Sequence, residues 1–145
     1  MLKNQERKLL LLQAKSSCKY QNDLSIDSIK RYVRAVDFMK KRPLSVMAIY
    51  QLGEFISPKN GEFIWRTTPA TFRDLSRAID PEHIIRALNS LVDAREFLYV
   101  TPEQFFIEFE KIHPFNDGNG RVGEILYWKM TGNFSAPHSH FSNHD

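Results

Sequence analysis

The sequence is poor in the residues and runs that define several classes of protein. It has one cysteine, Cys18, in 145 residues, so no disulfide can form within the chain, and a lone thiol fits a reducing compartment. The N-terminal apolar run, Leu9–Leu12, is too short for the hydrophobic region of a secretion signal, and no stretch approaches the length of a membrane span. These absences favour a cytoplasmic protein with no membrane segment.

The composition is that of an ordinary globular protein, with 42% hydrophobic and 26% charged residues. We expect one folded domain over residues 26–132, a basic N-terminal extension or helix over residues 1–25, and a flexible tail over residues 133–145. Three histidines of the tail, His138, His140 and His144, stand among Ser, Asn and Pro residues. That setting favours a flexible end over a metal site.

Charge is unevenly distributed along the chain. Residues 1–42 carry eleven Lys/Arg and four Asp/Glu, a net charge of +7, whereas residues 43–145 carry nine and thirteen, a net charge of −4. The basic N-terminal third is either a solvated helical face or a surface for an acidic partner or nucleic acid.

Apolar spacing and boundary residues predict a mainly α fold. The expected helices are a short N-terminal one that packs Leu9–Leu12, then Asp27–Lys41, Leu44–Phe55, Asp80–Arg95, Pro102–Ile112 and a last one from about Gly120 to Thr131. Thr101 and Gln104 form a capping box, Asp80 is a candidate cap, and Gly132 is a candidate C-cap. The second helix has Ile26, Ile29, Val33 and Val36 as its apolar stripe. The third places Val46, Met47, Tyr50 and the Leu52/Phe55 pair in the core.

A short segment between these helices has strand character. Glu62–Arg66 alternates weakly and is rich in β-forming residues, and Thr67–Thr71 follows with a proline inside. The two stretches form either a small β-hairpin or a connecting loop.

The residues that can carry chemistry gather in the segment HPFNDGNGRVG, from His113 to Gly123. Its glycines let backbone N–H groups approach phosphate oxygens without an intervening Cβ atom. A helix that begins near Gly120 would direct free N–H groups and the positive end of its dipole to the same place. Asp117 is a hard oxygen ligand suited to Mg²⁺, and His113 can act as a base near neutral pH. The segment therefore predicts a phosphate site with its own base and metal ligand.

The unbroken run HPFNDGNGR resembles the active-site motif of the Fic (Fic/Doc) family, H-x-F-x-[D/E]-[G/A]-N-[G/K]-R-x-x-R. A looser resemblance covers about residues 26–130. It implies a Fic-like helical bundle in which the segment 62–71 is a flap that holds the target by strand pairing. The usual activity of the family is transfer of a phosphate-containing moiety, most often AMP from ATP, to a hydroxyl side chain of a protein.

The resemblance also implies a role for each matching residue. His113 would deprotonate the target hydroxyl, and Phe115 would seat the loop in the core. Asp117 would hold Mg²⁺, with ATP as the donor. The phosphates would be bound by Gly118, Asn119, Gly120 and Arg121.

One position departs from the family pattern, because Glu124 stands where the motif ends in arginine. That arginine contacts the terminal phosphate of ATP in the family, whereas a carboxylate would repel it. The exchange is worth several kcal/mol, since two unit charges about 4 Å apart interact by about 4 kcal/mol at an effective dielectric constant of about 20. Glu124 is also one helical turn from Arg121 and can pair with it.

Three functions are consistent with this pattern. The first is a protein adenylyltransferase (an AMPylator). The second is a phosphotransferase, or another nucleotidyl transfer, of the Doc type. The third is a weak or inactive Fic-like binding module, with Glu124 as the cause.

Regulation and partners follow from the same resemblance. Many Fic proteins carry an inhibitory helix, S/T-x-x-x-E-G/N, but no Glu in this chain precedes Gly or Asn. Restraint would then come from a separate inhibitor or antitoxin chain, or from Glu124 itself. The expected partners are a nucleotide and a target protein with a Ser, Thr or Tyr hydroxyl. No membrane is expected, and nucleic acid is a less favoured partner than protein.

Overall fold

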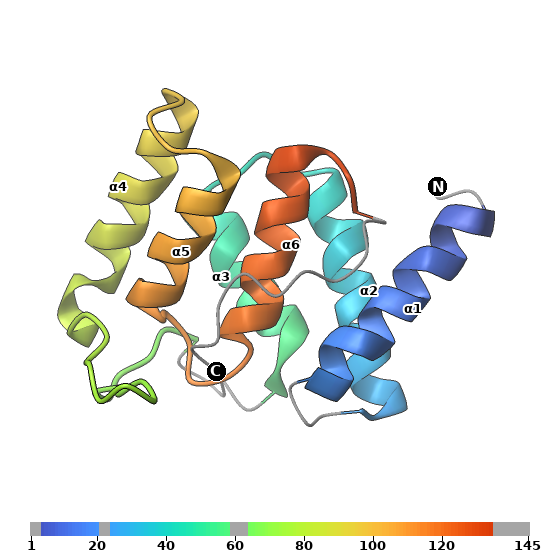
Figure 1. Ribbon diagram of the computed structural model, residues 1–145, viewed down its shortest axis with the longest axis horizontal. Helices are drawn as coiled ribbons and strands as arrows, with labels where there is room; N and C mark the ends of the chain where they lie inside the picture. The colour runs from blue at the N-terminus through green and yellow to red at the C-terminus, as the bar shows by residue number, and fades with distance from the viewer. Residues whose placement is uncertain (1–3, 21–23, 59–63, 135–145) are drawn as a thin grey trace.

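A computed structural model describes residues 4–20, 24–58 and 64–134, and within these ranges the predicted mainly α fold is confirmed (Figure 1). The helices are α1 (Asn4–Tyr20), α2 (Ile26–Lys40), α3 (Val46–Ile56), α4 (Ile84–Glu96), α5 (Pro102–Ile112) and α6 (Asn119–Thr131). None of the described helices is long and apolar enough to cross a membrane.

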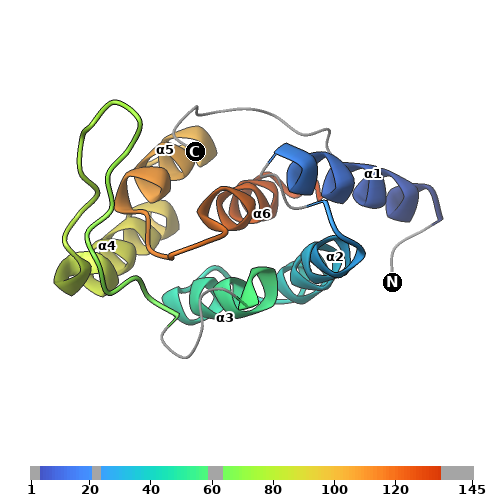
Figure 2. The ribbon, with the colours of Figure 1, turned by 90° about the horizontal axis from the view of Figure 1, so that it is seen from below.

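Helix α6 is the centre of the bundle. Seen from below, it lies between α5 and α1, with α2 and α3 forming a layer beneath it (Figure 2). The nine-residue motif begins where α5 ends and continues into the first turn of α6, so two packed helices fix both ends of the loop.

The helix ends follow the capping residues closely. The Thr101 hydroxyl accepts from Gln104 N at 3.1 Å, and the Gln104 side chain accepts from Thr101 N at 2.8 Å, which confirms the capping box. Gly132 ends α6 with φ = 78°, as expected for a left-handed C-cap. The prediction for Asp80 was wrong, because it makes no side-chain capping bond and precedes a 3₁₀ turn, Pro81–His83, that leads into α4.

The predicted inner faces of the first three helices needed correction. Of the four leucines Leu9–Leu12 in α1, only Leu10 is buried. The buried apolar face of α1 consists of Leu10, Ala14 and Cys18, which are spaced four residues apart. Ile26 is 74% exposed at the start of α2, and Met47 is 66% exposed on α3. The buried apolar residues of these two helices are Tyr32, Ala35, Val36 and Met39, followed by Ala48, Ile49, Leu52 and Ile56. Helix α1 packs mainly on α2, and α2 and α3 pack on each other and on α6, so the residues that face these neighbours are the buried ones.

The hairpin lies further along the chain than predicted. Residues 62 and 63 fall outside the described ranges, but Trp65 pairs with Phe115 of the motif loop, and Thr71 pairs with Arg77. The first predicted strand therefore pairs with the motif loop instead of with the second. Residues 70–78 form a hairpin turn of their own (the lower-left loop in Figure 1).

The end of the chain is partly described. Phe134 is buried, and its carbonyl accepts from Gln13 Nε2 of α1 at 3.2 Å, so the predicted tail is anchored at its start. The three tail histidines lie outside the described residues.

Candidate active site

His113 ends helix α5 in a left-handed conformation, with φ = 50° and ψ = 62°. Its N–H still donates to Phe109 O at 3.1 Å, so the residue closes the helix and turns the chain into the loop. Left-handed backbone is uncommon for a residue other than glycine, although histidine is enriched there. This conformation is held by contacts from elsewhere in the chain.

The main such contact is a buried arginine that the sequence did not single out. Arg66 is 2% exposed and donates from Nε to His113 O at 2.8 Å and from Nη2 to Ile112 O at 3.2 Å. The same guanidinium donates from Nη1 to Thr68 O and from Nη2 to Ile79 O, each at 2.6 Å. Burial lowers the pKa of Arg66, and the charge of Asp80 partly opposes that shift. The guanidinium of Arg66 thus joins the end of α5 to both ends of the segment formed by residues 68–79.

The hairpin segment, residues 68–79, reaches back to His113. Its turn is closed by Phe72 N donating to Ser76 O at 2.8 Å, and the Asp74 carboxylate accepts from Ser76 N at 3.0 Å. The Phe72 ring then meets the imidazole of His113 edge to face, with ring centroids 5.4 Å apart and an angle of 88°. The segment begins within the predicted flap, residues 62–71, and extends beyond it, and we call residues 68–79 the flap from here on.

Phe115 seats the loop in the core, as predicted. It is fully buried, its ring stacks on Trp65 at 5.5 Å and 12°, and Arg66 N donates to Pro114 O at 2.7 Å beside it. Gly53 makes room on α3, because a Cβ atom there would lie 2.4 Å from the Phe115 ring.

Asn119 closes the loop through its side chain. Its Oδ1 accepts from Phe115 N at 2.9 Å, and its Nδ2 donates to Phe115 O at 2.8 Å. The amide therefore shapes the turn, and what Asn119 can offer a phosphate is its backbone N–H. The N–H groups of the first turn of a helix have no acceptor within the helix, so those of α6 are suited to an anion.

Asp117 and Arg121 lie together at the start of α6. Asp117 Oδ2 accepts from the Ser57 hydroxyl and from Arg121 Nη2, the latter at 3.3 Å. The side chain of Asp117 is 31% exposed, whereas that of Arg121 is 2% exposed. The structure thus presents the carboxylate to solvent and keeps the guanidinium beneath it.

Gly118 precedes α6 with φ = 88°, and Gly132 follows it with φ = 78°. Alanine at either position incurs the left-handed cost of about 1–2 kcal/mol. A Cβ atom at Gly118 would also lie 2.6 Å from Ile56 Cγ2, whereas one at Gly132 meets nothing within 4 Å. We expect Gly118→Ala to lower the free energy of unfolding by about 1–3 kcal/mol more than Gly132→Ala, measured by urea denaturation. Equal losses would show that the contact with Ile56 has no influence.

Glu124 lies in a polar cluster between three helices. Its Oε1 accepts from Ser17 Oγ of α1 at 2.6 Å and from Tyr32 Oη of α2 at 3.2 Å, and the residue is 6% exposed. The carboxylate at the position of the last motif arginine is therefore held by two hydroxyls in the helical interior. Its expected repulsion of a triphosphate stays a prediction.

This cluster predicts a pH dependence of stability. Burial first, and the charge of Glu124 second, raise the pKa of Tyr32 well above its usual value. The folded protein then keeps a proton that unfolded tyrosine loses near pH 10, so stability is full well below pH 10 and falls as the pH rises through and above that value. We expect the free energy of unfolding in urea to decrease between about pH 9 and pH 11 by up to about 1.4 kcal/mol per pH unit for this group.

The variant Tyr32→Phe should flatten that decrease. Tyr127 is only partly buried, and its pKa is raised less, by partial burial first and by Glu103 second, so Tyr127→Phe is the comparison that should flatten the decrease less. If Tyr32→Phe leaves the slope of unfolding free energy against pH unchanged, the assignment of this pH dependence to Tyr32 is wrong.

A groove of about 710 Å³ runs between the flap, α4 and α5. It is lined by Phe72, which contacts His113, and by Ile112, which precedes it, with Ile79 and Leu91 completing an apolar wall. The groove therefore borders the proposed base on the side of the flap.

Comparison with known proteins adds one match. The model of the Fic/DOC family matches residues 44–130, from just before α3 through almost all of α6. No curated protein matches the chain. The matched region includes the flap and the whole motif loop, and it leaves out α1 and α2.

Proposed function

Because this chain belongs to the Fic/DOC family, we propose that it is a protein adenylyltransferase that moves AMP from ATP to a hydroxyl side chain of a target protein. The observation that supports this most directly is the construction of the motif loop. The loop is tied internally by Asn119, at one end by Arg66, and at the other by the packed start of α6. A loop fixed in this way holds His113 and the N–H groups of α6 without reorganisation, which is what phosphoryl chemistry requires.

In the proposed reaction His113 is the general base. The hydroxyl oxygen of the target attacks the α-phosphorus of ATP, its proton passes to the imidazole, and the new O–P bond forms. The bond between the α-phosphorus and the bridging oxygen breaks, and pyrophosphate leaves with the electron pair. The N–H groups at the start of α6 stabilise the charge that develops on the phosphate oxygens.

Mg²⁺ fits the residues at this site through Asp117. Among the described residues, three potential metal ligands lie close together at Asp80, Glu82 and His83, in the turn before α4. Asp117 is not part of that group, so it would act as a single protein ligand. A single partly exposed carboxylate suits Mg²⁺, which is commonly bound by one or two carboxylates with substrate phosphates and waters. When bound, the ion would neutralise phosphate charge, while Arg121 keeps Asp117 in place.

The flap and its groove supply a place for the target. Phe72 packs on the imidazole, so a target segment that lies along the flap would bring its hydroxyl to the base. The apolar wall of the groove would then accept a neighbouring side chain of the target.

A nucleotide panel tests the proposal. The protein is incubated with host-cell lysate, Mg²⁺ and labelled ATP, GTP or UTP, and we expect labelling of a protein from ATP. Intact mass of the labelled protein separates an AMP adduct from a phosphate adduct, and the latter would favour transfer of the Doc type. Absence of labelling from every donor would contradict the enzymatic function.

A nucleotide-binding module of low activity is the second candidate. Two observations favour it, because Arg121 is almost fully buried and Glu124 occupies the last motif position. Isothermal titration with ATP and Mg²⁺, read together with the labelling panel, separates the two candidates, since a module binds nucleotide without transferring any part of it.

A further inference from the structure

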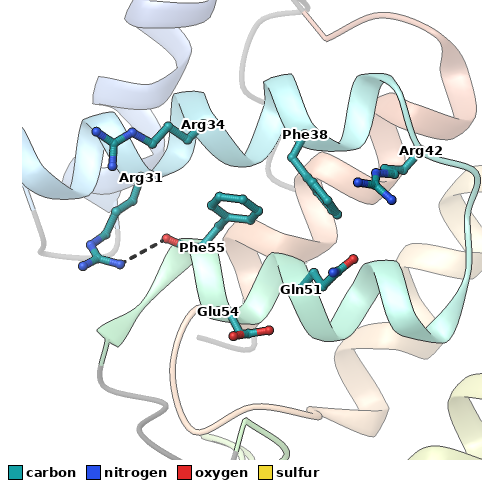
Figure 3. Close-up of a pocket in the computed structure, with 7 residues that line it drawn as sticks. All are labelled: Arg31, Arg34, Phe38, Arg42, Gln51, Glu54 and Phe55. Carbon is teal, nitrogen blue, oxygen red and sulfur yellow. Dashed lines mark hydrogen bonds between the residues drawn. The ribbon is translucent and has the colours of Figure 1, made fainter.

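A cavity of about 520 Å³ lies between α2 and α3, and none of the residues that line it belongs to the motif (Figure 3). Its lining is Arg31, Arg34, Phe38 and Arg42 from the α2 side and Gln51, Glu54 and Phe55 from α3. Arg31, Arg34 and Phe38, at intervals of three and four, lie along one face of α2, and Arg42 lies two residues beyond the last helical residue, Lys40. We call this cavity the arginine groove.

The floor of the arginine groove is aromatic. The rings of Phe38 and Phe55 lie 5.1 Å apart with an angle of 42°, and Figure 3 shows them between the arginine side chains. The Arg42 guanidinium lies 5.1 Å from the centroid of the Phe38 ring. A partly buried apolar floor beside cations can accept an apolar side chain and strengthens the attraction of a nearby carboxylate.

The charges of the groove are only partly balanced. Arg31 forms a salt bridge with Asp27 at 2.7 Å and donates to Phe55 O at 3.4 Å, so its charge is already paired. Arg34 and Arg42 are exposed and have no acidic partner within the described parts of the chain. Two cations are therefore available to an anionic ligand.

The positive surface continues across α2. A second cavity, of about 280 Å³, lies between α1 and α2, and Arg34 lines both cavities. Arg7 and Lys30 also line the second one. The net charge of +7 in residues 1–42 is therefore concentrated, in part, on a surface hollowed on both sides of one helix.

We infer that the arginine groove binds a short acidic segment of a partner protein. An apolar side chain of the segment lies over Phe38 and Phe55, and carboxylates on either side pair with Arg34 and Arg42. Arg34 lies within α2 and Arg42 two residues beyond its end at Lys40, so about 9 Å of helix and two further residues separate them. That distance is spanned by about four residues of extended chain. The inference goes beyond the proposed transfer reaction, because the groove contains no residue of the motif.

The composition of the groove favours a protein segment over nucleic acid. Glu54 is exposed in its wall and Asp37 lines the second cavity, so a uniform polyanion would meet both carboxylates. Single-stranded nucleic acid also needs open aromatic faces for stacking, whereas the two phenyl rings pack on each other. Arginine beside aromatic rings is typical of the centres of protein interfaces.

Fluorescence anisotropy with three labelled probes tests this inference in the full chain at about 0.15 M salt, where long-range attraction is screened. The probes are a nine-residue peptide with glutamates on both sides of a central leucine pair, the same peptide with glutamine in place of glutamate, and a nine-nucleotide single-stranded DNA. We expect the acidic peptide to bind at least about tenfold more tightly than either other probe, a difference that corresponds to about 1.4 kcal/mol. Neither nucleotide nor transfer activity is needed, so the result is independent of the proposed function.

Two variants and one control locate the binding. Arg34→Glu/Arg42→Glu should weaken binding of the acidic peptide by at least about tenfold, as should Gln51→Trp, which fills the groove without changing its charge. The matched control, Lys40→Glu/Lys41→Glu, makes the same charge change on exposed residues outside the groove and should alter binding by less than about threefold. Thermal unfolding confirms that each variant is folded. Tighter binding of the DNA, equal losses in the control, or no binding of the acidic peptide would each overturn the inference.

Discussion

The variant His113→Ala is expected to lower the rate of transfer by about 10²- to 10⁴-fold, the usual contribution of a positioned general base. The imidazole is held at the end of α5, against the flap residue Phe72, and next to the loop that would bind the phosphates. The measurement is the initial rate of labelling of a purified target, or of lysate protein, from labelled ATP. Because the N–H groups at the start of α6 are unchanged, ATP affinity measured by titration should change little.

The control for this variant is His83→Ala. His83 lies in the 3₁₀ turn before α4, and its imidazole contacts Glu82 and Arg86. Its replacement should leave labelling within about twofold of wild type, as expected of a surface change away from the site. If His113→Ala transfers at the wild-type rate, the assignment of the base is wrong.

The second large effect is expected at Arg66, which acts on the site through other residues. Arg66→Met keeps the length of the side chain but removes hydrogen bonds to four carbonyls, those of Ile112, His113, Thr68 and Ile79. Those carbonyls then remain in the interior with fewer donors, so the free energy of unfolding should fall by about 3 kcal/mol. Transfer should also decrease, because His113 and the flap lose their common support.

The conservative variant and a control separate positioning from general instability. Arg66→Lys keeps the charge but cannot match the planar arrangement of donors, so it should restore part of the stability and less of the maximal rate. Arg77→Met removes an exposed arginine of the flap, which has only a 4.0 Å contact with Asp80, and should cost less than about 0.5 kcal/mol. A pH–rate profile of Arg66→Lys that matches wild type in both shape and height would show that Arg66 does not position the base.

Local sequence was enough to predict the motif loop and several helix ends. The capping box at Thr101 and the C-cap at Gly132 involve residues within a few positions of each other, so their geometry follows from residue type alone. The same is true of the loop between α5 and α6, which could be placed because a strong helix boundary stands on each side of it. The burial of Phe115 also followed from its place in the motif.

The environment of Arg66 could not be predicted in the same way. Its acceptors are backbone carbonyls, which every residue has, so no residue type marks them in the sequence. One indication was present, because Arg66 lies two residues after the buried Ile64 and therefore on the same side of an extended chain. Such alternation predicts an inward charge but not what it contacts.

The position of Glu124 illustrates the same limit over a longer range. Its hydrogen-bond donors are 107 and 92 residues away, on α1 and α2. The sequence identified Glu124 as a departure from the family motif, and only the packing of three helices showed which side chains hold its carboxylate.

The sequence by itself determined the helical class, the boundaries of most helices and the order of chemical groups in the loop, because these depend on residues close together in the chain. The tertiary structure decided which face of each helix is buried, how the flap meets His113 through Phe72 and Arg66, and where the arginines of α2 form a groove. Those features depend on the relative positions of helices, and many of the contacts that fix these positions involve backbone groups and residues distant in sequence, which local patterns do not encode.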